Sequence, residues 1–250
     1  MAVKLLPKAL KTHDLCPGCG HGIILRLLAE VLEELHVTNN TCLAVGVGCS
    51  CHASINNLIG GDSFQCSHGR AGAVATGMKR VKPGMVVICY QGDGDAAVIG
   101  LSETLNAAYR NERISVFVVN NANFGMTGGQ MSWTTLQGQK TTTSVNGRNC
   151  LESGAPIRLP ELIASQFNVA YAARASVHDI KHITQAKKMI KNAIQSQLAG
   201  EGYSIVEFLS SCPTNWHMSP IEANKYIGNN VLSVYPVGEF KLRQETGSLL

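Results

Sequence analysis

Residues 91–129, QGDGDAAVIGLSETLNAAYRNERISVFVVNNANFGMTGG, indicate both the fold and its chemistry. An apolar run at 85–90 precedes this stretch, and a second run at 114–119 follows an amphipathic segment within it. Two strands joined by a helix make a right-handed parallel crossover, so both strands end at the same edge of a sheet. Asp93 follows the first strand and Asn121 follows the second. A carboxylate and an amide that meet at one edge suit a hard cation such as Mg2+, which also holds phosphate oxygens.

Further apolar runs predict that the sheet extends beyond these two strands. The run at 85–90 is apolar throughout, as expected for a central parallel strand covered by helices on both faces. The predicted strands are 41–47, 85–90, 114–119, 169–175 and 203–209, and the predicted helices are 22–36, 67–79, 96–110, 160–167 and 178–198. Residues 53–66 read as a loop, and 203–209 reads as the last strand. We therefore expect one α/β domain over residues 1–250 with a three-layer parallel sheet, an N-terminal arm at about 1–21 and a C-terminal tail at about 214–250.

The composition is that of an ordered globular domain. Apolar residues make up 45% of the 250 residues and charged residues 15%, with a net charge of +4. The basic residues are dispersed and lack the pattern of a nucleic-acid binder. Residues 1–15 contain no apolar signal-peptide core, and no apolar run reaches the roughly 20 residues of a membrane span. We expect a cytoplasmic protein whose nine cysteines are thiols or ligands rather than disulfides.

Four of the cysteines lie where the predicted sheet would bind a ligand. Cys16 and Cys19 form a C-x-x-C turn, which is typical of a metal or iron–sulfur ligand pair, of a redox dithiol or of two packed residues in a turn. Cys49 follows the strand at 41–47, and Cys212 follows the last strand. One C-x-x-C motif with two distant single cysteines favours a [4Fe–4S] cluster over a Zn(Cys)4 site. Cys51 is the alternative to Cys49, because it lies only two residues further on.

Two other segments suggest binding rather than packing. His68 stands at the start of a helix rich in small residues, where it is either a cap or a contact to a phosphorylated cofactor. Residues 126–159 show little periodicity, and a loop of this length in a compact domain is typical of a functional lid or of a partner surface.

The pairing of GDG at 92–94 with NN at 120–121 resembles a thiamine diphosphate signature. In that signature the aspartate, the second asparagine and a backbone carbonyl two residues later bind the Mg2+ ion that holds the diphosphate. The resemblance assigns these roles to Asp93, Asn121 and the carbonyl of Asn123. A nicotinamide fingerprint fits less well, because G-x-G-x-x-G would need glycine where Ala97 stands.

Further motifs extend the resemblance to a family. Over about residues 12–215 the chain resembles the β subunit of 2-oxoacid:ferredoxin oxidoreductases. The resemblance rests on the motifs CPGCGHG, GVGCS, HGRA, GDGD and FGMTGGQ. The resemblance implies thiamine diphosphate, Mg2+ and one [4Fe–4S] cluster. The cluster ligands carry over to Cys16, Cys19, Cys49 and Cys212. The cofactor contacts carry over to Gly48, Cys49, Ser50, His68, Gly69, Gly94, Asp95, Gly125 and Met126, of which His68 and Met126 are the candidate catalytic residues.

The resemblance also implies a reaction and its partners. The family converts a 2-oxo acid and coenzyme A to acyl-CoA and CO2, and electrons pass singly through the cluster to ferredoxin. Met126 stands where pyruvate-specific members have asparagine, which favours 2-oxoglutarate or a branched-chain 2-oxo acid, and Trp133 replaces a common proline in the pocket lid. An α subunit is expected to supply the glutamate that activates the cofactor, with γ and ferredoxin-like δ subunits beside it. The alternatives are a non-redox thiamine-dependent decarboxylase or acyl transferase, and a non-catalytic iron–sulfur or zinc scaffold.

Overall fold

A single mostly parallel sheet runs through the protein. The computed structural model describes residues 7–8, 10–11, 13–55 and 61–243. Its sheet has seven strands in the order β2-β1-β3-β4-β6-β5-β7, with β1 to β6 parallel and β7 antiparallel to β5. The strands are β1 (Thr41–Val45), β2 (Asp62–Gln65), β3 (Val86–Gly92), β4 (Ser115–Asn120), β5 (Tyr171–Ser176), β6 (Ser204–Leu209) and β7 (Gly238–Lys241).

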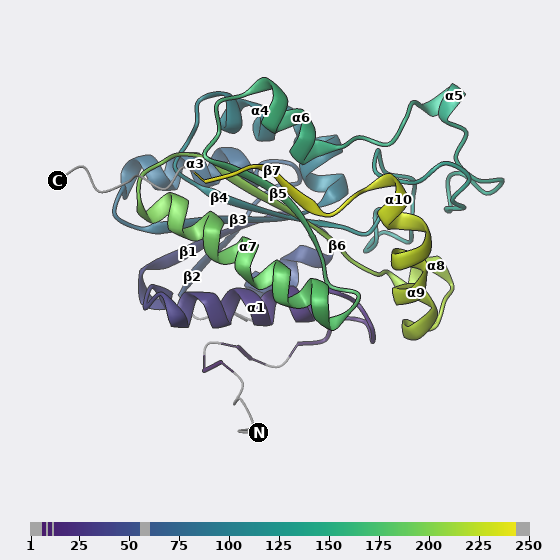
Figure 1. Ribbon diagram of the computed structural model, residues 1–250, viewed down its shortest axis with the longest axis horizontal. Helices are drawn as coiled ribbons and strands as arrows, with labels where there is room; N and C mark the ends of the chain where they lie inside the picture. Colours follow the sequence, from purple (N-terminus) through teal and green to yellow (C-terminus); the bar gives the residue numbers. More distant parts are fainter. Residues whose placement is uncertain (1–6, 9, 12, 56–60, 244–250) are drawn as a thin grey trace.

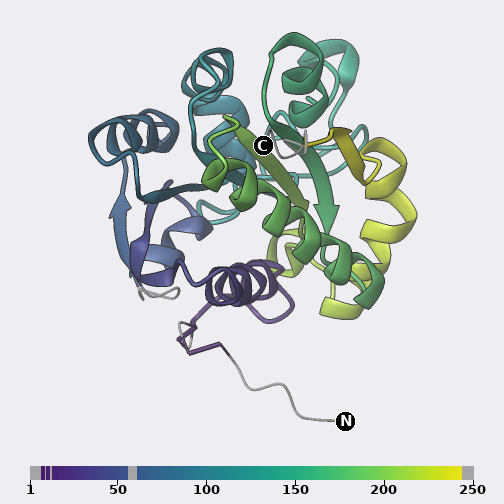
Figure 2. The same cartoon turned by 60° about the vertical axis from the view of Figure 1, so that its left-hand side comes forward.

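Helices cover both faces of this sheet. The helices are α1 (His21–Glu34), α2 (His52–Ile55), α3 (Ala71–Val81), α4 (Leu101–Tyr109), α5 (Cys150–Ser153), α6 (Leu159–Gln166), α7 (Ile180–Leu198), α8 (Pro213–Trp216), α9 (Pro220–Tyr226) and α10 (Leu232–Val234). The structure also has two short 3-10 segments, η1 (Thr38–Asn40) and η2 (Cys49–Cys51), and two π-helical turns, η3 (Asp95–Ile99) and η4 (Ile227–Val231). Helices α1 and α7 lie on one face, and α3, α4 and α6 lie on the other (Figures 1 and 2). The predicted three-layer α/β fold is therefore confirmed.

The apolar runs of the sequence become central strands because both of their faces are buried. In β3, Val86, Ile88 and Tyr90 pack into the core on the side of α1 and α7. Val87 and Cys89 pack into the second core, under α3 and α4. Alternating side chains thus point to opposite layers, and each needs to be apolar.

The interpretation of residues 53–66 as a loop is wrong at both of its ends, while residues 56–60 lie outside the described residues. The helix α2 ends there, and β2 pairs in parallel with β1 at the edge of the sheet. Phe64 in this strand is 59% exposed, and Asp62 is exposed as well. An edge strand with so little burial has no apolar pattern that the sequence could reveal.

The interpretation of 203–209 as the last strand is also wrong. Helices α8 to α10 follow β6, and β7 then returns to pair with β5. Ser219 and Glu222 form a capping box at the start of α9, a signal that was readable in the sequence. Residues 244–250 of the predicted tail, and residues 1–6, 9 and 12 of the predicted arm, lie outside the described residues. Within the described ranges, no helix has both the length and the apolar character needed to cross a bilayer.

Candidate cofactor-binding site

A cavity opens at the edge of the sheet where β1, β3 and β4 end. This is the edge at which open parallel sheets bind their ligands. The walls come from the loops that follow these strands, from the turn before α3 and from the first residue of α1. The lining residues are His21, Val47, Gly48, Cys49, Ser50, His68, Gly92, Asp93, Gly94, Asp95, Asn121, Asn123, Phe124, Gly125, Met126 and Thr127.

Most of the residues predicted to contact the cofactor or Mg2+ lie in this wall. Gly69 is the exception among them, and its backbone N–H instead donates to Oδ1 of Asp95 over 2.8 Å. Four further residues line the cavity without having been predicted as site residues: His21, Val47, Phe124 and Thr127. Trp133, which was expected to shape the lid of the pocket, is not among the lining residues and is 46% exposed.

Three oxygen atoms converge where β3 and β4 end. The side-chain oxygen of Asn121 lies 3.2 Å from Oδ1 of Asp93 and 2.7 Å from the backbone oxygen of Asn123. Neighbouring ligands of an octahedral Mg2+ ion, each at about 2.0–2.1 Å, lie about 2.9 Å apart. Turned the other way, the amide of Asn121 would donate from its nitrogen to both oxygens. The position therefore fits a hydrogen-bond donor or, with the oxygen inward, a hard cation.

The second oxygen of Asp93 is held by the loop that follows Gly129. Oδ2 accepts a short hydrogen bond from the hydroxyl of Thr134, and Ser132 also bonds to the carboxylate. Burial raises the pKa of the Asp93 carboxyl to about 7, against the lowering effect of these bonds and of the Gly94 backbone. A cation beside Oδ1 would supply the positive charge that this buried carboxylate lacks.

A buried arginine fixes the loop that carries Thr134. Arg148 is 2% exposed. It donates to five backbone carbonyls, those of Ser132, Trp133, Thr135, Ser153 and Gly154. The hydroxyl of Thr135 also donates to the carbonyl of Ala122, over 2.7 Å. The part nearest the cavity is thus ordered by these bonds, while α5 projects away from the body (Figure 1).

We expect Thr134→Val to weaken Mg2+ binding by about tenfold or more. The substitution keeps the shape but removes a donor to a buried carboxylate, a bond worth about 1.5–3 kcal/mol. Thr134→Ser, which keeps the hydroxyl, is the matched control and should behave as wild type. The measurement is the Mg2+ concentration at which the complex half-retains thiamine diphosphate. An unchanged Mg2+ requirement in Thr134→Val would contradict this role for the hydroxyl.

The first asparagine of the NN pair is anchored in the core. Nδ2 of Asn120 donates over 2.9 Å to Glu207 on β6, and Oδ1 accepts from the backbone N–H of Ala122. Glu207 in turn pairs over 2.5 Å with the fully buried Arg174 of β5. Ala122 has φ 58°, an uncommon conformation for alanine, and this bond helps to hold it. Asn120 therefore shapes the turn that directs Asn121 into the cavity.

Asp95 joins the loops that end β1 and β3 to the turn before α3. Its Oδ1 accepts from the backbone N–H groups of Val47 and Gly69 and contacts Nδ1 of His68. Its Oδ2 accepts from the side chain of Gln91. A Cβ at Gly46 would lie 2.1 Å from this carboxylate, so only glycine fits there. Both oxygens of Asp95 are thus engaged by the protein, and it orients His68.

Aromatic and imidazole rings close the remaining walls. The ring of Phe124 lies against Gly94, where an added Cβ would come within 2.3 Å of it. It also meets the ring of His68 edge-on, at 6.2 Å between centroids. His21 is buried, and its Nδ1 lies 2.8 Å from the hydroxyl of Tyr90. Burial and the nearby His52 lower the pKa of His21 to about 3, so this ring is neutral.

The structure brings Cys16, Cys19, Cys49 and Cys212 together beside the cavity. The hydroxyl of Ser211 donates over 2.6 Å to the carbonyl of Gly18, which ties the C-x-x-C turn to the end of β6. Burial, together with the nearby Cys49, Cys212 and Cys16, raises the pKa of the Cys19 thiol to about 12, against the lowering effect of a hydrogen bond with the backbone of His21. Burial, together with the nearby Cys212, Cys16 and Cys51, raises the pKa of the Cys49 thiol to about 11. A cationic centre among the four sulfurs would reverse these shifts.

No three of these sulfurs in the described part of the chain lie as close together as the ligands of a single zinc ion. Four thiolates on a single Zn2+ at about 2.3 Å lie about 3.8 Å apart. In the described part of the chain, the one group of three ligands within 4.8 Å of each other consists of His178, Asp179 and His182, and it contains no cysteine. An iron–sulfur cluster is larger than a single ion and holds its ligands further apart.

Comparison with known proteins places this arrangement in a family. Residues 46–208 match the model of the thiamine pyrophosphate enzyme C-terminal TPP-binding domain. The chain is 42% identical over 236 residues to ketoisovalerate oxidoreductase subunit VorA of Methanothermobacter thermautotrophicus. It is 34% identical over 238 residues to 2-oxoglutarate synthase subunit KorB of Methanothermobacter marburgensis. The chain belongs to the 2-oxoacid:ferredoxin oxidoreductase family of thiamine enzymes. The family resemblance inferred from the motifs is thereby confirmed.

The matches cover nearly all of this chain but different shares of its relatives. The alignments cover 94% and 92% of this chain, but 49% of the VorA subunit and 78% of the KorB subunit. The chain thus spans about half the length of its ketoisovalerate relative. A solved 2-oxoglutarate:ferredoxin oxidoreductase from Magnetococcus marinus, with 2-oxoglutarate, coenzyme A and succinyl-CoA bound, has a TM-score of 0.76 to this chain. The two chains are 23% identical in sequence. Their structural alignment covers 96% of this chain and 86% of the solved one, which supports a shared fold.

Proposed function

We propose that this chain is the β subunit of a 2-oxoacid:ferredoxin oxidoreductase that binds thiamine diphosphate through Mg2+ and holds one [4Fe–4S] cluster. One observation carries the proposal: Cys49 belongs to the four-cysteine group and also lines the cavity that contains the three converging oxygens. A redox centre and a diphosphate site therefore share a wall. A non-redox thiamine enzyme needs only the oxygens, and a metal scaffold needs only the sulfurs.

In this proposal each residue of the cavity has a separate role. Bound thiamine diphosphate supplies the carbon nucleophile that releases CO2 from a 2-oxo acid, and a cluster takes up electrons singly. Asp93, Asn121 and the carbonyl of Asn123 hold Mg2+. Asp95 keeps His68 turned to the cofactor, and Phe124 shields the reacting atoms from water. The acyl group then passes to coenzyme A, and the electrons pass to ferredoxin.

A partner subunit is part of the proposal. Thiamine enzymes of this family need a glutamate at the cofactor, and the residues that line the cavity include none. Met126, at the cavity wall, is 48% exposed, so a second protein surface has room to cover it. We infer that an α subunit completes the site, with γ and ferredoxin-like δ subunits in the same complex. Activity should require this complex. The cytoplasmic location expected from the sequence stays a prediction.

The chemistry of the wall favours a branched-chain substrate. The lining residues include no arginine or lysine to pair with a second carboxylate. Met126 offers an apolar contact, and the ring of His21 is neutral. We infer that 2-oxoisovalerate is preferred, in agreement with the similarity to a ketoisovalerate oxidoreductase subunit. The similarity to KorB keeps 2-oxoglutarate as the second candidate, and its use would require a cationic residue from the partner.

Anaerobic purification of the co-expressed complex tests these proposals. We expect iron and acid-labile sulfide in about equal amounts, thiamine diphosphate, and ferredoxin reduction that depends on coenzyme A. Zinc in place of iron and sulfide would favour the scaffold. Thiamine diphosphate without iron would favour the non-redox enzyme. Rates with 2-oxoisovalerate, 2-oxoglutarate and pyruvate then decide the substrate, and a higher rate with 2-oxoglutarate would overturn the branched-chain preference.

A further inference from the structure

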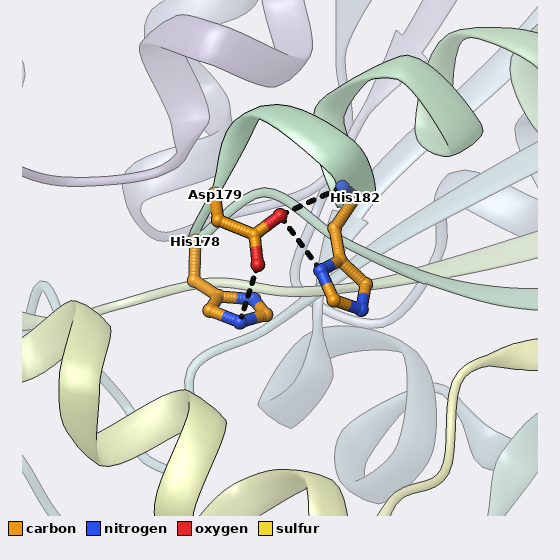
Figure 3. Close-up of side chains that lie close together, drawn as sticks. All are labelled: His178, Asp179 and His182. Carbon is orange, nitrogen blue, oxygen red and sulfur yellow. Dashed lines mark hydrogen bonds and ion pairs between the residues drawn. The ribbon is translucent and has the colours of Figure 1, made fainter.

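Three potential metal ligands lie together outside the cofactor site. His178 and Asp179 follow β5, and His182 lies in the first turn of α7 (Figure 3). Each residue offers one ligand atom, and the three atoms all lie within 4.8 Å of one another. The carboxylate of Asp179 interacts with both imidazole rings, one oxygen to each, and the ring centroids are 4.5 Å apart. None of the three lines the cofactor cavity.

The distances are those of a small coordination site. Nε2 of His178 lies 3.3 Å from Oδ2 of Asp179, and Nδ1 of His182 lies 2.8 Å from Oδ1. Nitrogen and oxygen ligands at about 2.0–2.2 Å from a tetrahedral Zn2+ ion are about 3.3–3.5 Å apart. The first distance falls in this range, and the second is a hydrogen bond that a metal ion would replace with little movement.

Contacts with residues around the cluster hold the ligands in place. Oγ of Ser176 lies 2.7 Å from Nδ1 of His178, which orients the ring and leaves Nε2 facing Asp179. Such an outer partner is typical of metal-binding histidines. The side chain of His178 is only 10% exposed. Gly228 in the π-helical turn η4 lies beside its Nε2, where an added Cβ would come within 3.6 Å. The cluster is therefore preformed on one side and open on the other, since Asp179 is 45% exposed.

We propose that His178, Asp179 and His182 bind one divalent ion of the zinc class, with at least one coordination position open to solvent. Two imidazoles favour Zn2+, Co2+ or Ni2+ over Mg2+ or Ca2+, which take oxygen ligands. The ion would link the end of β5 to the first turn of α7. Because α7 packs against α1, which begins just after the C-x-x-C turn, binding would stabilise the layer behind the cysteines.

Zinc binding to the anaerobically purified complex, with its other metals in place, tests this site. After treatment with a mild chelator, the wild type should bind one equivalent of added Zn2+ per chain. His182→Gln should weaken that binding at least tenfold, and Asp179→Asn should do the same. His36→Gln, which changes an exposed histidine elsewhere, is the control and should bind as wild type. Thermal unfolding in chelator should match between wild type and His182→Gln, which shows that the fold is intact.

The outcomes are independent of the proposed enzyme activity, since the readout is metal binding. Added Co2+ should give visible absorption bands of a nitrogen- and oxygen-ligated ion, which His182→Gln removes. Equal Zn2+ affinity in the wild type and in both site variants would overturn the proposal. Absence of the additional equivalent in the wild type would also overturn it, and the cluster would then serve only as the hydrogen-bonded start of α7.

Discussion

Asp93→Ala should abolish retention of thiamine diphosphate and leave the iron–sulfur cluster in place. Asp93 supplies the one negative charge among the three oxygens that converge at the ends of β3 and β4. Without it, Asn121 and the carbonyl of Asn123 offer a Mg2+ ion only neutral ligands. We expect the affinity for Mg2+ and the cofactor to fall at least about a hundredfold, or about 2.8 kcal/mol.

The experiment measures thiamine diphosphate, iron and sulfide in the same anaerobic preparation. Asp62→Ala, which removes an exposed carboxylate on β2, is the matched control and should retain all three. Asp93→Asn keeps the shape without the charge, so its cofactor loss would show that charge is what matters. If Asp93→Ala retained as much thiamine diphosphate as the wild type does, the proposed Mg2+ site would be wrong.

The sequence predicted the central strands and the loops at their ends for a simple physical reason. Strands β3 and β4 are buried on both faces and therefore read as unbroken apolar runs. Parallel strands end at one edge, so Asp93 and Asn121 had to come close once the crossover was recognised. Their proximity followed from local patterns, and their roles as ligands stay predictions.

Other parts of the site depend on contacts that no local pattern reveals. Thr134 reaches Asp93 from a loop without periodicity, and that loop takes its shape from the buried guanidinium of Arg148. Asp95 lines the cavity, as expected for a cofactor contact, and its oxygens also accept from Val47, Gly69 and Gln91, which the sequence could not show. His21 follows the C-x-x-C motif in the sequence, and only the folded chain shows that it lines the cavity, with its Nδ1 2.8 Å from the hydroxyl of Tyr90. Long-range hydrogen bonds of single residues decide these positions.

Cys49→Ser should lose the iron–sulfur cluster, whereas Cys51→Ser should keep it. Both residues lie in the 3-10 segment η2, where residues two apart point about 120° away from each other. Cys49 lines the cavity, and after burial Cys212 and Cys16 raise the pKa of its thiol more than Cys51 does. Cys51 is buried, and Asp14 is the charged group that raises its pKa besides burial.

The measurement is iron and sulfide per complex after anaerobic purification, with the low-temperature electron paramagnetic resonance signal of the dithionite-reduced protein. Cys51→Ser serves as the matched control, because it makes the same change two residues away. We expect Cys49→Ser to lose most of its iron and all ferredoxin reduction, while thiamine diphosphate stays bound through Asp93. Loss of electron transfer without loss of bound thiamine diphosphate would support two separate centres in one cavity.

The opposite result would have a definite structural meaning. If Cys51→Ser lost the cluster and Cys49→Ser kept it, the ligand set would contain Cys51, and η2 would have to turn its other side towards Cys16 and Cys212. Such a turn would move Gly48 and Ser50 as well, because η2 begins directly after Gly48. The cavity wall would then change together with the cluster. One short turn thus positions both the cofactor contacts and a cluster ligand. If the cluster ligand in η2 were Cys51, the cofactor contacts assigned to Gly48 and Ser50 would have to be revised as well.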